Sequence, residues 1–183
     1  MTARLDSPAP SRAPAPLRAP GVVLGVGLGA FVDGIVLHQL LGWHHMVSNA
    51  GHDRLGLHPR PVTTVGGLEA NTVADGAFHV GAWVLTVVGV VLLARRRAAL
   101  AATARPGRVL AGWALVGWGA FDLVEGLVDH QLLAVHHMRQ GLSEAATLAW
   151  DLGFLAFGAV LVAAGLLLAR SAGPTRRDPG EAP

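Results

Sequence analysis

The sequence predicts an all-α integral membrane protein, a four-helix bundle built from two parallel two-helix repeats. Three observations carry this prediction: four long apolar stretches, a repeated histidine motif and an uneven distribution of arginine. Hydrophobic residues make up 52% of the 183 residues, charged residues only 14%, and the mean hydropathy is +0.47. Soluble domains of ordinary composition are less apolar and more highly charged.

Each of the four apolar stretches is as long as or longer than the roughly 20 residues that a helix needs to cross a bilayer. They lie at about 21–46, 70–94, 109–138 and 145–169. Together they predict one transmembrane domain over 21–170. The segments 1–20 and 171–183 are rich in Pro, Ala and Arg, and we expect them to be disordered tails because they cannot bury a core.

Arginine predicts the orientation of the helices. Most of the arginines precede the first stretch, fill the link between the second and third, or follow the fourth: Arg4, Arg12, Arg18, Arg95, Arg96, Arg97, Arg105, Arg108, Arg170, Arg176 and Arg177. Basic residues favour the cytoplasmic side, so we expect both termini in the cytoplasm. The segment 47–69 and the turn 139–144 then face outward, in a protein of the bacterial cytoplasmic membrane.

The first and third stretches share the motif H-Q-L-L-x-x-H-H-M. It runs from His38 to Met46 and again from His130 to Met138, at an offset of 92 residues. The same offset aligns Asp33 with Glu125. Parallel repeats are related by an axis along the membrane normal, so we expect His38 and His130 at one depth, facing each other.

Carboxylates inside the apolar stretches have no arginine or lysine partner there. They are Asp33, Asp75, Asp122, Glu125, Asp129 and Asp151. A buried carboxylate is costly unless it is protonated, paired or bound to a cation. Because histidines share the outer halves of the same stretches, the pattern predicts a transition-metal site there, as in the cores of helix bundles.

The leading candidate ligands are the histidines and carboxylates expected in one layer of the outer half. They are His38, His130, His79, Asp75 and Asp151. Further candidate ligands, or groups that support the ligands, are Asp33, Glu125, Asp129, His44, His45, His136 and His137. At about 100° per residue, His38 shares a helix face with His45, and Asp33 shares one with His44.

Several functions stay open on this pattern. Imidazole and carboxylate suit copper, iron, zinc or manganese, in a metalloenzyme such as a metal-dependent oxidoreductase or in a metal-binding or transfer protein. A haem protein of electron transfer is an alternative, with His38 and His130 as axial ligands. A structural or assembly protein with a hydrogen-bonded polar core and no metal is another.

Other partners and sites follow from composition. The absence of Cys excludes thiolate metal sites and iron–sulfur clusters. A net charge of +2 gives no indication of a nucleic-acid partner. The expected partners are the lipid bilayer and a metal ion, with a homo-oligomer or a second membrane protein left open.

The two histidine motifs, together with Asp33-Gly34 and Glu125-Gly126, resemble a bacterial family of predicted membrane proteins of unknown function. The resemblance extends from about Gly21 to Ala169. It implies a small protein with several membrane spans and carries no established activity, so the function must be argued from the site.

Overall fold

The structure, a computed structural model, describes residues 15–49, 58 and 60–171. In chain order its helices are η1 (Ala15–Leu17), α1 (Arg18–Val32), η2 (Asp33–Leu40), α2 (Val65–Arg95), α3 (Arg97–Ala102), α4 (Pro106–Glu125), η3 (Gly126–Leu132) and α5 (Glu144–Arg170). These described residues contain no β-strand, and the all-α prediction is confirmed.

Four helical segments are long and apolar enough to cross a membrane, which confirms the predicted number of spans. They are Arg18–Leu40, Val65–Arg95, Pro106–Leu132 and Glu144–Arg170. Large apolar side chains such as Val73, Trp83 and Val160 are exposed on α2 and α5. An exposed apolar face suits contact with lipid tails, which are as apolar as the side chains themselves.

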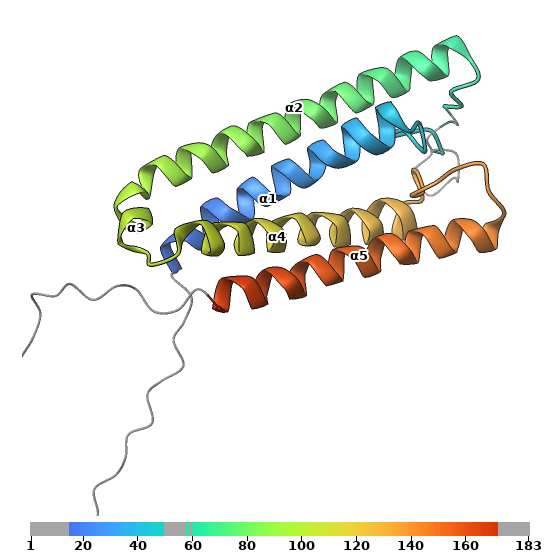
Figure 1. The fold of residues 1–183 in the computed structure, drawn as a ribbon. Helices are drawn as coiled ribbons and strands as arrows, with labels where there is room; N and C mark the ends of the chain where they lie inside the picture. Colours follow the sequence, from blue (N-terminus) through green and yellow to red (C-terminus); the bar gives the residue numbers. More distant parts are fainter. Residues whose placement is uncertain (1–14, 50–57, 59, 172–183) are drawn as a thin grey trace, which may run out of the picture.

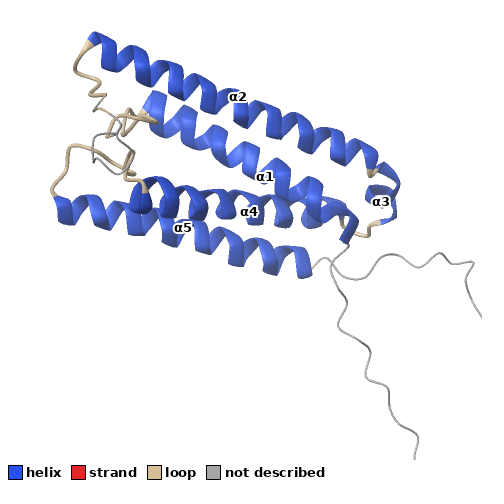
Figure 2. Cartoon of the chain, turned by 180° about the vertical axis from the view of Figure 1, so that it is seen from behind, coloured by secondary structure: helices blue, strands red, loops and turns tan. Residues whose placement is uncertain are grey.

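The helices pack in the order α2, α1, α4, α5, because the packed pairs of long helices are α1–α2, α1–α4 and α4–α5 (Figure 1). Figure 2 shows the same order from behind, with α2 and α5 at the two edges. The short helix α3 and both ends of the described helical region lie at one end of the bundle. The loops that follow η2 and η3 lie at the opposite end.

Glycines bring the two central helices, α1 and α4, into close contact. A Cβ atom added at Gly25 would collide with the carbonyl of Ala114, and one at Gly117 would collide with the carbonyl of Val22. Small residues of this kind let the backbones of membrane helices approach closely. The backbones of α1 and α4 are therefore held next to each other.

The first and third spans end earlier than the sequence pattern predicts. The hydrophobic pattern extends them to Met46 and Met138, whereas the helices end at Leu40 and Leu132. The chain leaves each helix through a residue in the left-handed region, Gly42 at φ +58° and Ala134 at φ +50°. A left-handed residue just past the last turn is a common way to end a helix. The His-His-Met segments are thus loops.

The N-terminal helix begins within the predicted tail. Ala15–Leu17 form η1, and Pro20 lies in the first turn of α1, where its missing N–H would have no helical partner in any case. Leu17 is fully buried against Val109 and Trp113. This packing holds Ala15–Leu17 against the bundle. The remaining parts of the two predicted tails, 1–14 and 172–183, lie outside the described residues.

Candidate metal centre

Two loops close the end of the bundle that carries the histidine motifs. The Asn49 N–H donates to the Val135 carbonyl at 3.0 Å, and the Gln140 N–H donates to the Trp43 carbonyl at 3.0 Å. The guanidinium of Arg139 lies over the Trp43 ring, 5.3 Å from its centroid. The two loops are therefore bonded to each other as well as to the helices from which they emerge.

Four histidines meet beneath these loops. His38 and His130 project from η2 and η3, and His44 and His136 come from the loops. All four are at most 1% exposed. The ring centroids of His38 and His44 are 4.4 Å apart, and those of His130 and His136 are 4.9 Å apart. Each helix end and the loop that follows it thus contribute one pair of buried imidazoles.

One carboxylate stands below each pair of histidines. Oδ2 of Asp33 is 3.0 Å from Nε2 of His38, and Oε1 of Glu125 is 3.5 Å from Nε2 of His136. Asp33 is five residues before His38, and on an α-helix that spacing would separate them by about 140°. The segment is π-helical, with the i→i+5 pattern, which brings the two side chains to one face.

Backbone carbonyls fix the orientation of the two loop histidines. Nδ1 of His44 donates to the Met138 carbonyl at 2.9 Å, and Nδ1 of His136 donates to the Met46 carbonyl at 3.2 Å. A carbonyl can only accept, so Nδ1 carries the hydrogen and Nε2 keeps its lone pair. Burial, together with the neighbouring His38, lowers the pKa of His44 to about 3. Each of these two loop histidines thus presents an Nε2 atom with a lone pair, the neutral form of imidazole that binds metals.

Asp75 of α2 supports the first pair of histidines from behind. Its Oδ1 accepts from Nδ1 of His38 at 3.0 Å and from the Met46 N–H at 2.9 Å. Its Oδ2 accepts from Nδ1 of His45 at 2.6 Å. Asp75 therefore holds the outward nitrogen of His38, and the Nε2 atom of that ring points to the centre.

Asp151 of α5 has the matching position in the second half. It accepts from Nδ1 of His137 at 2.8 Å, from the Met138 N–H at 2.9 Å and from Nε2 of Gln131 at 3.1 Å. Nδ1 of His130 is 3.5 Å from its Oδ1. An outer carboxylate that orients a ligand histidine is typical of metal sites.

The four buried histidines, Asp33 and Glu125 form a central cluster of six side chains. Their inner atoms make few hydrogen bonds. Within the described part of the chain, nine buried nitrogen and oxygen atoms of these residues make no hydrogen bond. They are both carboxylate oxygens of Asp33 and of Glu125, both ring nitrogens of His130, and Nε2 of His38, His44 and His136. Oδ2 of Asp33 and Nε2 of His38 lie 3.0 Å apart and pair with each other only when a proton lies between them. Buried polar atoms are nearly always paired, so this cluster of unpaired donors and acceptors could hold a cation.

Two sets of four side chains offer ligand atoms that lie within 4.8 Å of one another. One set is Asp33, His38, His44 and Glu125, and the other is His44, Glu125, His130 and His136. All of these side chains are buried. The geometry and the chemistry of the donors therefore fit a metal ion with nitrogen and oxygen ligands.

Residues 20–172 match the family described as "Predicted membrane protein (DUF2243)". The match covers most of the chain. This protein belongs to the DUF2243 family. No curated protein and no solved structure matches it. The family description agrees with the four candidate spans, and it names no activity.

The structure distributes the predicted site residues of this DUF2243 protein over distinct positions. His38 and His130 lie in the centre, as do four residues that the sequence places second, Asp33, Glu125, His44 and His136. Six other predicted residues lie outside both four-residue sets: Asp75, Asp151, His79, Asp129, His45 and His137.

His79 lies apart from the central histidines among aromatic side chains. Its ring centroid is 6.4 Å from that of Phe31 and 6.1 Å from that of Phe78. A Cβ atom added at Gly34 would lie 2.6 Å from Nε2 of His79. The side chain therefore packs against η2, on the side of that helix where Gly34 leaves room for it.

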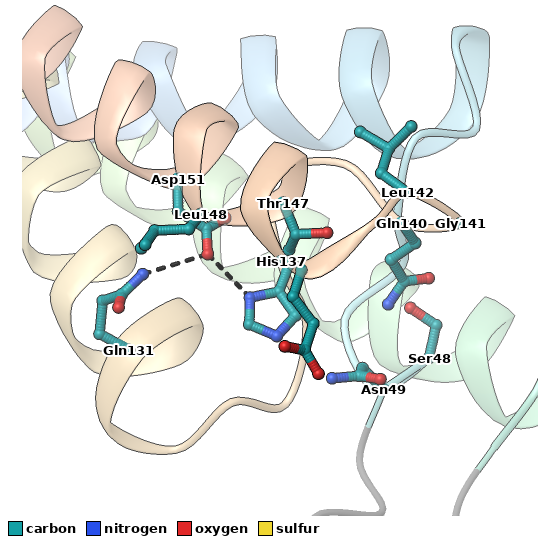
Figure 3. Close-up of a pocket in the computed structure, with 11 residues that line it drawn as sticks. Ser48, Asn49, Gln131, His137, Gln140, Gly141, Leu142, Thr147, Leu148 and Asp151 are labelled. Atoms are coloured by element: carbon teal, nitrogen blue, oxygen red, sulfur yellow. Dashed lines mark hydrogen bonds and ion pairs between the residues drawn. The ribbon is translucent and has the colours of Figure 1, made fainter.

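A pocket of about 610 Å³ opens beside the histidines of the second half of the chain (Figure 3). Asp151 and His137 line it, together with Gln131 and Glu144. Figure 3 shows Gln131 and His137 both pointing to the carboxylate of Asp151. Since Asp151 also lies 3.5 Å from His130, one side chain separates this pocket from the central histidines.

Proposed function

We propose that this DUF2243 protein holds a non-haem transition-metal centre between its central helices. The ligands are Asp33, His38, His44, Glu125, His130 and His136. The observation that carries the proposal is the set of nine buried polar atoms without hydrogen-bond partners among the described residues. Each such atom costs about 1–3 kcal/mol when it is left unpaired, and a cation bonded to these atoms removes that penalty.

The ligand chemistry favours iron or manganese. Imidazole suits iron, copper and zinc, and carboxylate suits manganese. The order of preference is therefore iron or manganese first, with zinc and copper next. The six side chains are at most 4% exposed. Such a closed site favours a resident metal over one that is passed to a partner, since a transfer protein needs an accessible route with weaker ligands.

The ligand set also favours a metalloenzyme. Each half of the chain supplies two of the histidines and one of the carboxylates, and such a set leaves open coordination positions on iron, as in oxygen-activating enzymes. An enzyme also needs space for a substrate beside the metal, and the pocket next to Asp151 and His137 offers such space. A metal-dependent oxidoreductase is the reaction class that these two features support best.

The haem and structural alternatives have less support. A haem between His38 and His130 needs a gap for the macrocycle, yet the rings of His44 and His136 lie 4.4 Å and 4.9 Å from them. A purely hydrogen-bonded core would pair its polar atoms, and the inner atoms of these residues are unpaired in the described part of the chain.

The proposed location is the cytoplasmic membrane, with both termini inside and the metal centre in the outer half. Arg95 and Arg97 lie at the α3 end of the bundle, and the His-His-Met loops lie at the other. Positive charge favours the cytoplasmic side, which directs the loops and the centre outward.

The first experiment is elemental analysis of the gently purified full-length protein together with its visible spectrum. We expect bound iron or manganese in stoichiometric amount and no Soret band. Absence of any bound transition metal, before and after titration with Fe(II) and Mn(II), would contradict the proposal. A Soret band at stoichiometric intensity would replace it with the haem alternative.

A further inference from the structure

Each half of the molecule contributes one carboxylate and two histidines to the centre. Asp33, His38 and His44 come from η2 and the loop after it. In the second half, Glu125 closes α4, His130 lies on η3 and His136 lies on the following loop. Two histidines and one carboxylate are a complete ligand set for one metal ion with open positions.

The two sets of neighbouring ligand atoms follow this division. The first contains all three residues of the first half plus Glu125, and the second contains all three of the second half plus His44. Metal–ligand bonds of about 2.0–2.2 Å place two ligands at most about 4.4 Å apart across one ion. Neither set contains all six residues, so the six ligand atoms do not all lie within 4.8 Å of one another, and the side chains as they stand do not surround one ion.

Glu125 can serve both sets, whereas His44 can serve only one ion. Both oxygens of Glu125 are buried and lack hydrogen-bond partners among the described residues, so one oxygen is available to each ion. Nδ1 of His44 is bonded to the Met138 carbonyl at 2.9 Å, which leaves Nε2 alone for coordination.

The charge of the surroundings fits two divalent ions. Two carboxylates, Asp33 and Glu125, lie inside the centre, and two more, Asp75 and Asp151, lie directly behind its histidines. In the described residues, the cationic or potentially cationic side chains paired with these four carboxylates are all histidines. Two divalent ions balance four carboxylates, whereas a single one leaves an excess of buried negative charge.

We infer that the centre is dinuclear, with one ion held by Asp33, His38 and His44, the other by Glu125, His130 and His136, and Glu125 bridging the two. This inference rests on the proposed function and adds the number of ions and their arrangement.

The test is Mn(II) loading of the full-length protein in detergent, after removal of bound metal with a chelator. We expect two Mn(II) per chain by elemental analysis, and an electron paramagnetic resonance spectrum of a spin-coupled pair. Asp33→Asn and His130→Ala should each bind one Mn(II) and give the resolved hyperfine pattern of an isolated ion. His79→Ala is the matched control, since it removes a half-buried histidine outside both sets, and it should keep the coupled pair.

Three results would overturn the inference, and the metal count separates them. One Mn(II) per chain in the wild-type protein rejects the dinuclear centre and leaves the proposed metal site standing. Two uncoupled ions show that the second lies elsewhere, which also rejects it. No bound Mn(II) rejects the inference and counts against the proposed function. The wild-type count and spectrum decide the matter even if a variant fails to fold.

Discussion

The imidazole rings of His44 and His136 are stacked, with centroids 4.8 Å apart and an interplanar angle of 3°. Each ring comes from one loop and donates its Nδ1–H to the methionine carbonyl of the other, Met138 and Met46 respectively. The two halves of the chain are therefore joined directly at the centre. Any ligand bound there depends on both loops at once.

Loss of a loop histidine should lower the metal content. His44→Ala removes the one imidazole that belongs to both ligand sets, so we expect its metal content to fall by about half or more. His79→Ala is the control, because it deletes a half-buried histidine and leaves both ligand sets intact. Elemental analysis of the two purified variants checks this. Equal metal loss in both variants would show that the assignment of ligands is wrong.

Replacing an outer carboxylate should weaken the metal site without destroying it. Asp75→Asn keeps the shape of the side chain but replaces one of its two oxygens by an NH₂ group, which cannot accept a hydrogen bond. One of the two bonds from His38 and His45 is therefore lost. Loss of such an outer partner weakens metal affinity by about 10–100-fold. Competition with a chelator measures the affinity. Asp129→Asn, outside both ligand sets, should leave it unchanged.

The left-handed residue that ends the third span should be improvable. Ala134 has φ +50°, where its Cβ is strained, and Gly42 occupies the equivalent position in the first half at φ +58°. Ala134→Gly should raise the free energy of unfolding by about 1 kcal/mol, and Gly42→Ala should lower it by a similar amount. A Cβ at Gly42 meets no atom within 4 Å, so the backbone alone sets the effect.

Thermal unfolding in detergent measures both of these changes. A higher midpoint for Ala134→Gly and a lower one for Gly42→Ala are the expected pair. The opposite signs would show that these two loop residues do not adopt the left-handed conformation in the folded protein.

The α1–α4 contact should be sensitive to a single methyl group. Gly117→Ala places a Cβ against the carbonyl of Val22, and overpacking of this kind costs about 1–3 kcal/mol. Gly81→Ala is the control on α2, where an added Cβ meets no atom within 4 Å. We expect a lower unfolding midpoint for Gly117→Ala alone. Unchanged midpoints in both variants would argue against the close approach of these helices.

The orientation can be tested with single cysteines, because the chain has none of its own. Thr63 precedes α2 near the histidine loops, and Ala98 lies on α3 at the other end, and both are exposed. In intact cells a membrane-impermeant thiol reagent should label Thr63→Cys and spare Ala98→Cys. The reverse pattern would place the metal centre on the cytoplasmic side.

The number of membrane-spanning helices was predictable because length and apolar composition decide it in a membrane. The ends of the first and third helices were not. A run such as His38 to Met46 continues the apolar pattern of the helix before it, so its hydrophobicity contains no stop signal. The stop depends on backbone conformation at Gly42 and Ala134, and alanine gives no indication of a left-handed residue.

The ligand ranking depended on the same helix geometry. A period of 100° per residue puts Asp33 and His38 on different faces, and the π-helical turn joins them at 3.0 Å. The signal that could have revealed the pairing is the repetition of a carboxylate five residues before a histidine, at Glu125 and His130 as well. The sequence pattern includes all six central residues, but it gives the outer carboxylates Asp75 and Asp151 a central place.

The most direct test of the proposed centre is a crystal structure of the metal-loaded protein with anomalous diffraction data at the edge of the bound metal. We expect anomalous density within bonding distance of Nε2 of His44 and a carboxylate oxygen of Glu125. Anomalous density at His79, His45 or His137, with none among the six central side chains, would contradict the proposed centre.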